Sequence, residues 1–171
     1  MNTQQQRATF DAWLRDYAGI LHHVANAFAT GADRHDLMQE LMLAVWRAVP
    51  AFRAASLAST FIYRVTHNAA LTWKRAERGY RRRLDTFEEL QPARTGAPDH
   101  PPGDDPAERL ALLYTAIRAL EPVDRSLVLL QLDGVSYADI AAIHGITESN
   151  VGVRLNRIKQ KLTAILKETT S

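Results

Sequence analysis

The stretch from Ser136 to Leu166 constrains the fold most, because it predicts two helices joined by a tight turn. Ser136 followed by Asp139 is a variant of the capping box that starts a helix, and Gly145 can adopt the left-handed conformation that stops it. Thr147 is a suitable N-cap for a second helix. A short helix, a glycine turn and a longer helix are the parts of a helix-turn-helix.

The second of these predicted helices carries two stripes of opposite chemistry. Its apolar residues recur at spacings of four and three, as a single buried face requires: Val151, Leu155, Ile158, Leu162 and Ile165. The other stripe contains Asn150, Arg154, Arg157 and Lys161, which in a major groove can reach base edges and phosphates. We therefore predict duplex binding, although a merely solvated helix face would have the same composition.

Composition narrows the class of protein further. A chain of 171 residues with 46% hydrophobic content can bury one ordinary core or two small ones. The net charge is only +2, but the run Arg81 to Arg83 follows Arg78 closely and favours an anionic partner. The absence of cysteine excludes a disulfide framework and a cysteine nucleophile. Without a signal peptide or an apolar run of roughly 20 residues, we expect a soluble, cytoplasmic protein.

Two amphipathic helices are predicted in the first part of the chain. The first runs from Phe10 to Phe28, and we expect Gly31 to end it. Its neighbouring His22 and His23 point about 100° apart on a helix, so we predict no metal site there.

The second of these helices, Arg34 to Val49, is expected to start at an Asp33 cap and to stop before Pro50. It is apolar on nearly every side, which favours a helix shared with a partner protein. Gln39 and Glu40 could direct that contact, or they could be its solvated edge.

A third helix is predicted from Phe61 to Arg78. One side of it is apolar, and the other combines aromatic, basic and amide groups: Tyr63, Arg64, His67, Asn68, Lys74 and Arg75. Stacking surfaces beside phosphate-neutralising cations suit unstacked bases better than a closed duplex. A solvated helix face is again the alternative.

The segment from Leu84 to Asp105 is acidic and rich in proline and glycine, which is typical of a linker. Beyond it, Asp105 and Pro106 start a helix that reaches Leu120, and Asp124 is expected to cap another that ends at Leu132. We therefore predict an all-α fold: two small helical domains, 1–83 and 106–171, joined by an acidic Pro/Gly-rich linker, 84–105, with the helix-turn-helix in the second domain.

Four segments, taken in order, resemble the extracytoplasmic-function (ECF) sigma factors of bacterial RNA polymerase, members of the sigma-70 family. Asp36 to Ala48, D-L-M-Q-E-L-M-L-A-V-W-R-A, is similar to the region-two helix that docks on the polymerase clamp. F-I-Y-R-V-T-H-N-A-A-L, Phe61 to Leu71, is similar to the helix that reads the minus-ten element. The stretch from Leu120 to Ala141 and the ending V-R-L-N-R-I-K-Q-K-L resemble region four.

The resemblance implies a role for each set of residues. It implies core polymerase contacts from Asp36, Gln39, Glu40, Leu43 and Arg47, and minus-ten contacts from Tyr63, Arg64, His67, Asn68, Lys74 and Arg75. It implies contacts with the minus-thirty-five duplex from Thr147, Ser149, Asn150, Val153, Arg154, Asn156, Arg157 and Lys161. The function it implies is promoter recognition and strand opening without an enzymatic activity or a cofactor, with core RNA polymerase, promoter DNA and an anti-sigma factor or other inhibitor as partners.

The sequence departs from the family pattern at Ala58, Gly152 and Val153, so its base preference is left open. Two other functions compete with the sigma factor interpretation. One is a stand-alone helix-turn-helix regulator that binds duplex operator DNA. The other is an all-α enzyme that uses His22, His35, Asp33 and Asp36, but no pair of these has a spacing that forces a ligand set or an acid-base dyad.

Overall fold

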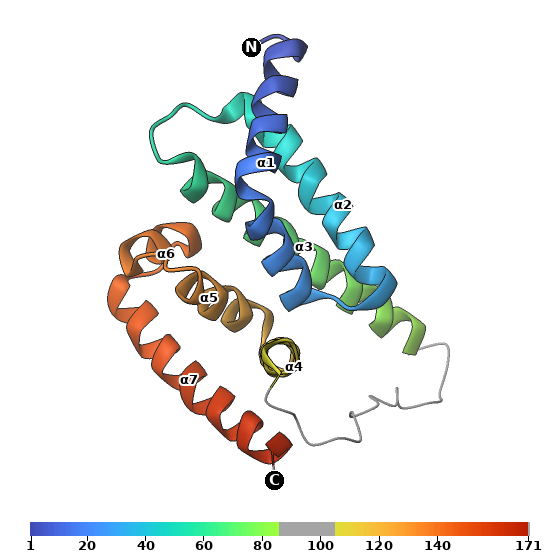
Figure 1. Ribbon diagram of the computed structural model, residues 1–171, viewed down its shortest axis with the longest axis vertical. Helices are drawn as coiled ribbons and strands as arrows, with labels where there is room; N and C mark the ends of the chain where they lie inside the picture. The colour runs from blue at the N-terminus through green and yellow to red at the C-terminus, as the bar shows by residue number, and fades with distance from the viewer. Residues whose placement is uncertain (86–104, 171) are drawn as a thin grey trace.

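The computed structural model describes residues 1–85 and 105–170, and within them the chain is all-α, with no strand (Figure 1). The first group of helices is α1 (Thr3–Phe28), α2 (Gly31–Ala48), the short 3-10 helix η1 (Val49–Ala51) and α3 (Ala58–Asp85). The second group is α4 (Pro106–Arg118), α5 (Pro122–Leu132), α6 (Tyr137–His144) and α7 (Glu148–Thr170). The predicted all-α fold is confirmed.

In the first group, α1, α2 and α3 pack against one another in pairs. Phe28, Leu37 and Leu41 are among the largest side chains that are fully buried between them. At one end of the group, the rings of Trp13 and Phe52 meet edge to face, with centroids 5.3 Å apart. Burial of aromatic side chains contributes much of the stability of so small a core.

The ends of α1 and α2 differ from the predicted ones. The first helix begins at Thr3 because Asn2 and Gln5 form a reciprocal capping box. Gly31 does not end α1; it lies at the start of α2 with a φ of +55°. Ala29 and Thr30 are extended and already make the corner, so Asp33 falls inside the first turn of α2 rather than at its cap.

The third helix is longer than its apolar pattern predicted. It continues beyond Arg78 to Asp85, and so includes the first residues of the segment expected to be a linker. The rest of that segment, 86–104, lies outside the described residues. The domain limits at 83 and 106 therefore stay a prediction.

In the second group, α5 lies at the centre and contacts α4, α6 and α7. It begins at Pro122 with Glu121 as its N-cap, so the prediction that Asp124 caps this helix is wrong. Proline fits the first helical position because it lacks the N–H that would have no partner there. Asp124 consequently lies inside the first turn, where its side chain is free to pair elsewhere.

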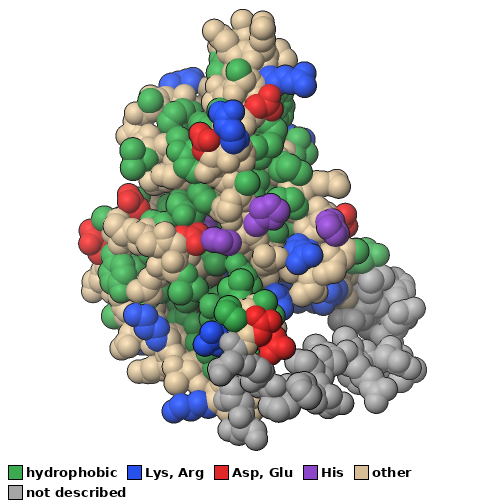
Figure 2. Space-filling model, in the orientation of Figure 1, with side chains coloured by type: hydrophobic (Ala, Val, Ile, Leu, Met, Phe, Trp, Pro, Cys, Tyr) green, Lys and Arg blue, Asp and Glu red, His purple; other side chains and the backbone are tan. Residues whose placement is uncertain are grey.

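The two groups pack against each other along a seam (Figure 1). Helix α1 contacts α4 and α5, and α3 contacts α5 and α6. Figure 2 shows histidine side chains across the middle of one face of the molecule. Among the described residues, no helix is long and apolar enough to cross a membrane.

Candidate nucleic-acid interface

The turn between α6 and α7 has the geometry of a helix-turn-helix. The Ser136 hydroxyl accepts a hydrogen bond from the backbone N–H of Asp139 at 3.1 Å, as a cap should. Gly145 ends α6 in the left-handed conformation with a φ of +66°. The Thr147 hydroxyl then accepts from the backbone N–H of Asn150 at 3.2 Å. Local capping therefore fixes where the recognition helix, α7, begins.

The recognition helix buries one face and exposes the other. Val151, Leu155 and Ile158 are at most 1% exposed, so the predicted apolar stripe is confirmed as core. An adjoining face of α7, next to α5, borders an open hollow of about 450 Å³. Its lining consists of Asp124, Asn150, Val153, Arg154, Arg157 and Lys161.

Five of the eight predicted duplex-binding residues thus line one hollow, and the remaining ones flank it. Thr147 and Ser149 are exposed at the start of α7, and Asn156 is exposed farther along it. The structure brings the predicted residues onto one side of the helix. Whether they contact DNA remains a prediction.

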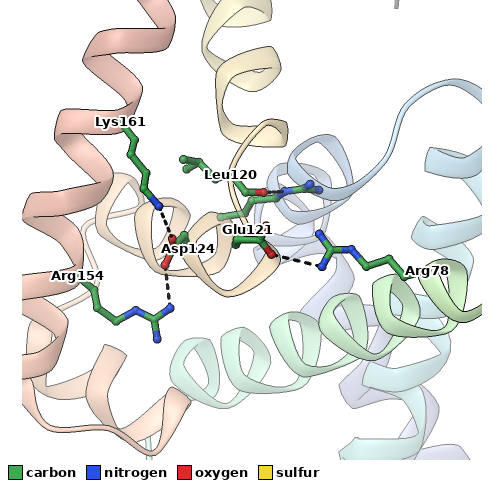
Figure 3. Close-up of polar contacts among 7 residues, drawn as sticks. Arg78, Leu120, Glu121, Asp124, Arg154 and Lys161 are labelled. Carbon is green, nitrogen blue, oxygen red and sulfur yellow. Dashed lines mark hydrogen bonds and ion pairs between the residues drawn. The ribbon is translucent and has the colours of Figure 1, made fainter. Parts of the chain in front are cut away.

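The hollow also contains a carboxylate that sequence reasoning did not place there. The Arg154 Nη2 donates a hydrogen bond to Asp124 Oδ1 at 2.9 Å, and Lys161 Nζ lies 3.8 Å from Asp124 Oδ2 (Figure 3). Asp124 is buried, with its side chain 12% exposed. The sequence pattern had indicated Asp124 as a helix cap and gave no sign that it pairs with residues of α7.

The residues predicted to contact melted DNA on α3 divide into two faces. Arg64, Asn68 and Arg75 are exposed and lie at spacings of four and seven, so they share one stripe. Tyr63, His67 and Lys74 share a second stripe, and none of them is fully exposed. His67 faces Ser126 of the second group of helices, whereas Lys74 pairs with a side chain of its own helix. Lys74 Nζ is held by Glu77 Oε2 at 2.7 Å.

His67 corrects the expectation that this entire set is exposed, because its side chain is 0% exposed. Its Nδ1 lies 2.5 Å from the Ser126 hydroxyl, which in turn lies 2.9 Å from His144 Nε2. This chain of polar groups joins α3 to α5 and α6. Burial and the nearby His144 lower the pKa of His67 to about 3, so the ring is neutral near pH 7.

Further polar contacts cross the seam. His23 Nδ1 lies 2.9 Å from Asp133 Oδ1, and Arg118 Nη1 donates to the backbone carbonyl of Asn26 at 2.8 Å. Burial, followed by the negative charge of Asp133, raises the pKa of Tyr63 to about 12. Tyr63 and His67 are therefore seam residues in this arrangement of the chain. Their periodicity shows that they share a face but does not reveal what covers it.

The residues predicted to contact polymerase lie on a single exposed face of α2. Asp36, Gln39, Glu40, Leu43 and Arg47 are all exposed, at spacings of three, one, three and four. Glu40 and Arg47 also border an open hollow of about 650 Å³ between α2 and α3, whose lining includes Asn68 and Trp73. The structure places these residues together, and their role remains a prediction.

The apolar character of α2 has a different explanation from the predicted one. Leu37, Leu41 and Val45 are buried, and Trp46 packs edge to face on Phe10 of α1 with ring centroids 5.4 Å apart. Helices α1 and α3 therefore cover most of the apolar surface within the chain. Leu43, 38% exposed, is the large apolar side chain of α2 that stays open to a partner.

No group of three or more histidine, aspartate or glutamate side chains that could hold a metal ion occurs within residues 1–85 and 105–170. His22 and His35 border one small hollow with Arg34, whose positive charge disfavours a cation. By fold and surface, the molecule is an all-α protein with a basic helix-turn-helix.

Comparison with known proteins identifies its family. A family model for sigma-70 region 2 matches residues 6–80, and one for sigma-70 region 4 matches residues 110–162. The ECF RNA polymerase sigma factor SigM of Mycobacterium tuberculosis is 29% identical over 168 residues, which cover 94% of this chain and 78% of SigM. The RNA polymerase sigma factor CarQ of Myxococcus xanthus is 27% identical over 164 residues, covering 95% and 91% of the two chains.

Two solved structures share the fold. The sigma factor RpoE of Bartonella quintana, in complex with the anti-sigma factor NepR, has a TM-score of 0.68 at 22% identity and covers 93% of this chain and 97% of that one. CnrH, in complex with the cytosolic domain of CnrY, has a TM-score of 0.60 at 20% identity, with coverages of 95% and 90%. The chain belongs to the sigma-70 family, as a member of the ECF type.

Proposed function

We propose that this chain directs core RNA polymerase to specific promoters and aids strand opening when transcription starts. The observation that carries the proposal is that the region 2 and region 4 matches occupy the two helical groups in order. Each group also has exposed residues of the predicted contact sets, Gln39 and Glu40 on α2 and Arg157 and Lys161 on α7. The comparisons do not favour a stand-alone helix-turn-helix regulator, because such a protein would not need the region 2 match, whose helix would dock on polymerase.

The first helical group would bind polymerase and melted DNA. Its limits would be residues 1–83, with residues 84–105 as the linker. On α2, the exposed face from Asp36 to Arg47 would meet the clamp of core polymerase. On α3, Arg64, Asn68 and Arg75 are all exposed while the seam is closed, so they would be accessible to the minus-ten strand.

Tyr63 and His67 could join that contact only after α3 separates from α5 and α6. His67 is fully buried against Ser126, and Tyr63 is half-buried beside it. We infer that the seam opens when the factor engages polymerase and promoter. Aromatic stacking of about 1 to 3 kcal/mol per base would then offset the cost of unpairing without nucleotide hydrolysis.

The second group, residues 106–171, would bind the minus-thirty-five duplex through α7. Its lysine and arginine side chains would supply the salt-dependent attraction to phosphates, and the residues of the hollow would read base edges. The chain would act as a binding protein without catalytic activity, in the cytoplasm where core polymerase works. The sigma factor RpoE was solved in complex with the anti-sigma factor NepR, and this supports a protein inhibitor as a further partner of this chain.

Capture of purified bacterial core polymerase by the full chain tests the proposal. We expect the wild type to bind core polymerase and the double variant Gln39→Ala, Glu40→Ala to lose most of that binding. Both side chains are exposed, so their truncation should leave the free energy of unfolding nearly unchanged.

A matched control is Gln4→Ala, Asp11→Ala, which removes the same two chemical groups from an exposed face of α1. This control variant should bind like the wild type. If neither the wild type nor the variants capture polymerase, while the chain alone binds one duplex tightly, the proposed function is wrong.

A further inference from the structure

Asp124 occupies an unusual position for a carboxylate, on the floor of the hollow beside the recognition helix. It comes from α5, whereas the other residues that line this hollow all come from α7. Its two oxygens face two cations of α7 that lie two helical turns apart, Arg154 and Lys161 (Figure 3). Asp124 therefore connects the predicted DNA-binding face to the helix beneath it.

The contact with Arg154 is the stronger of the two. Arg154 Nη2 approaches Asp124 Oδ1 to 2.9 Å, which is the length of a charge-assisted hydrogen bond, whereas the Lys161 ammonium stays at 3.8 Å. The Asp124 side chain is 12% exposed and that of Arg154 is 39% exposed. One end of the pair is thus fixed in the protein and the other opens into the hollow.

We propose that Asp124 is a positioning residue that sets the base preference of the recognition helix by holding Arg154. This inference rests on the proposed function, in which α7 binds the promoter duplex. A guanidinium has five N–H donors in a rigid fork, and Asp124 engages one of its nitrogens. The remaining donors are held in one orientation, as bidentate recognition of a guanine edge requires.

The same carboxylate has a second, opposite effect on DNA binding. Asp124 places a negative charge beside Arg154, Arg157 and Lys161, and this charge repels phosphates. Removing it should strengthen binding to DNA of any sequence while weakening the choice among sequences. A purely structural role for Asp124 would instead weaken both, because a displaced α7 loses all its contacts together.

Selection from a duplex pool with about ten randomised base pairs measures both effects. The full chain is used in complex with core RNA polymerase, as wild type, Asp124→Ala, Asp124→Asn and Arg154→Ala, and as the double variant Asp124→Ala, Arg154→Ala. Sequencing of the bound fraction gives the base preference, and titration with the unselected pool gives the general affinity.

For Asp124→Ala we expect roughly a tenfold loss of discrimination at the preferred position, the low end of the range for a bidentate pair. Affinity for the unselected pool should rise. Asp124→Asn should keep most of the preference, because its amide oxygen can still accept from Arg154, yet it should show the same rise in affinity. In the Arg154→Ala background, the further change at Asp124 should leave the preference unaltered.

Three results would overturn the inference. One is a wild-type preference that Asp124→Ala retains in full. Another is a parallel loss of preference and pool affinity in both Asp124 variants, which would show a structural role. The third is that the wild type in complex with core polymerase enriches no sequence from the pool. This result would refute the proposed DNA-reading role itself, and it would be seen with the wild type before any variant is compared.

Discussion

At the scale of single residues, His67 shows how a polar side chain becomes part of a core. Its ring is fully buried, its Nδ1 faces Ser126, and its Nε2 has no hydrogen-bond partner among residues 1–85 and 105–170. Protonation would place an uncompensated charge in this environment, beside His144, whose pKa is also lowered by burial. The neutral ring is therefore the form that the closed seam requires.

This requirement predicts a loss of stability in mild acid. The pKa of His67 is about 3 in the folded chain against an ordinary value of 6.5, so the unfolded chain binds the proton first. The contribution of His67 is complete above about pH 6.5 and is lost as the pH falls toward 3, with a slope approaching about 1.4 kcal/mol per pH unit. Urea unfolding at a series of pH values measures that slope.

His67→Asn is the matched control for the histidine, because an amide can replace the Nδ1 contact with Ser126 but does not titrate. The dependence of the unfolding free energy on pH between about 6.5 and 5 should be shallower in this variant. Equal slopes in the two proteins would show that the pH dependence comes from a group other than His67, such as His144, whose pKa is also lowered by burial.

At the scale of elements, the turn between α6 and α7 depends on one backbone conformation. Gly145 has a φ of +66°, and an added Cβ there would meet no atom within 4 Å. The cost of Gly145→Ala is therefore conformational rather than steric, and we expect a destabilisation of about 1 to 2 kcal/mol. Chemical denaturation measures it directly.

Gly152→Ala supplies the contrast within the same motif. This glycine lies inside α7, and an added Cβ would make an ordinary 3.6 Å contact with the Tyr137 ring. Alanine should stabilise the helix by up to about 1 kcal/mol, because glycine is the weaker helix former. If the two Gly→Ala substitutions change the free energy of unfolding in opposite directions, backbone conformation, and not side-chain volume, defines the turn. Destabilisation of similar size in both would contradict this explanation.

At the scale of the whole molecule, the seam holds the two helical groups together through a few polar contacts of unequal strength. The Ser126 hydroxyl is fully buried and lies within hydrogen-bonding distance of both His67 and His144. The Arg78–Glu121 ion pair spans the same seam at 3.4 Å, but the Glu121 side chain is 72% exposed. Solvent screening reduces the second contact far more than the first.

We therefore expect Ser126→Ala to loosen the closed arrangement and Glu121→Ala to leave it intact. The first change removes the partner of His67 Nδ1 and of His144 Nε2, at a cost of about 1 to 3 kcal/mol for the fully buried His67 and less for the half-buried His144. Small-angle X-ray scattering of the free chain measures the result as a larger radius of gyration. A Ser126→Ala protein as compact as the Glu121→Ala protein would show that the apolar contacts of the seam are sufficient to hold it closed.

The sequence by itself determined the local features of this protein. Helical periodicity, capping residues and Gly145 act within a few positions of the chain, so they predicted the helix-turn-helix, the buried stripe of α7 and the all-α class. The order of the region 2 and region 4 segments identified the family for the same reason, because each motif is continuous in sequence. Errors at this level were confined to helix ends, such as Asp33 and Asp124, where several residues could serve as the cap.

Only the tertiary structure decided which surfaces remain open. His67 and Arg64 belong to the same helix and the same predicted set, yet one is buried against Ser126 and the other is exposed. The partner of Arg154 is Asp124, distant in sequence and carried by another helix. Periodicity reports the side of a helix on which a residue lies, whereas its neighbours depend on how separate helices meet. That arrangement follows from packing over the whole chain.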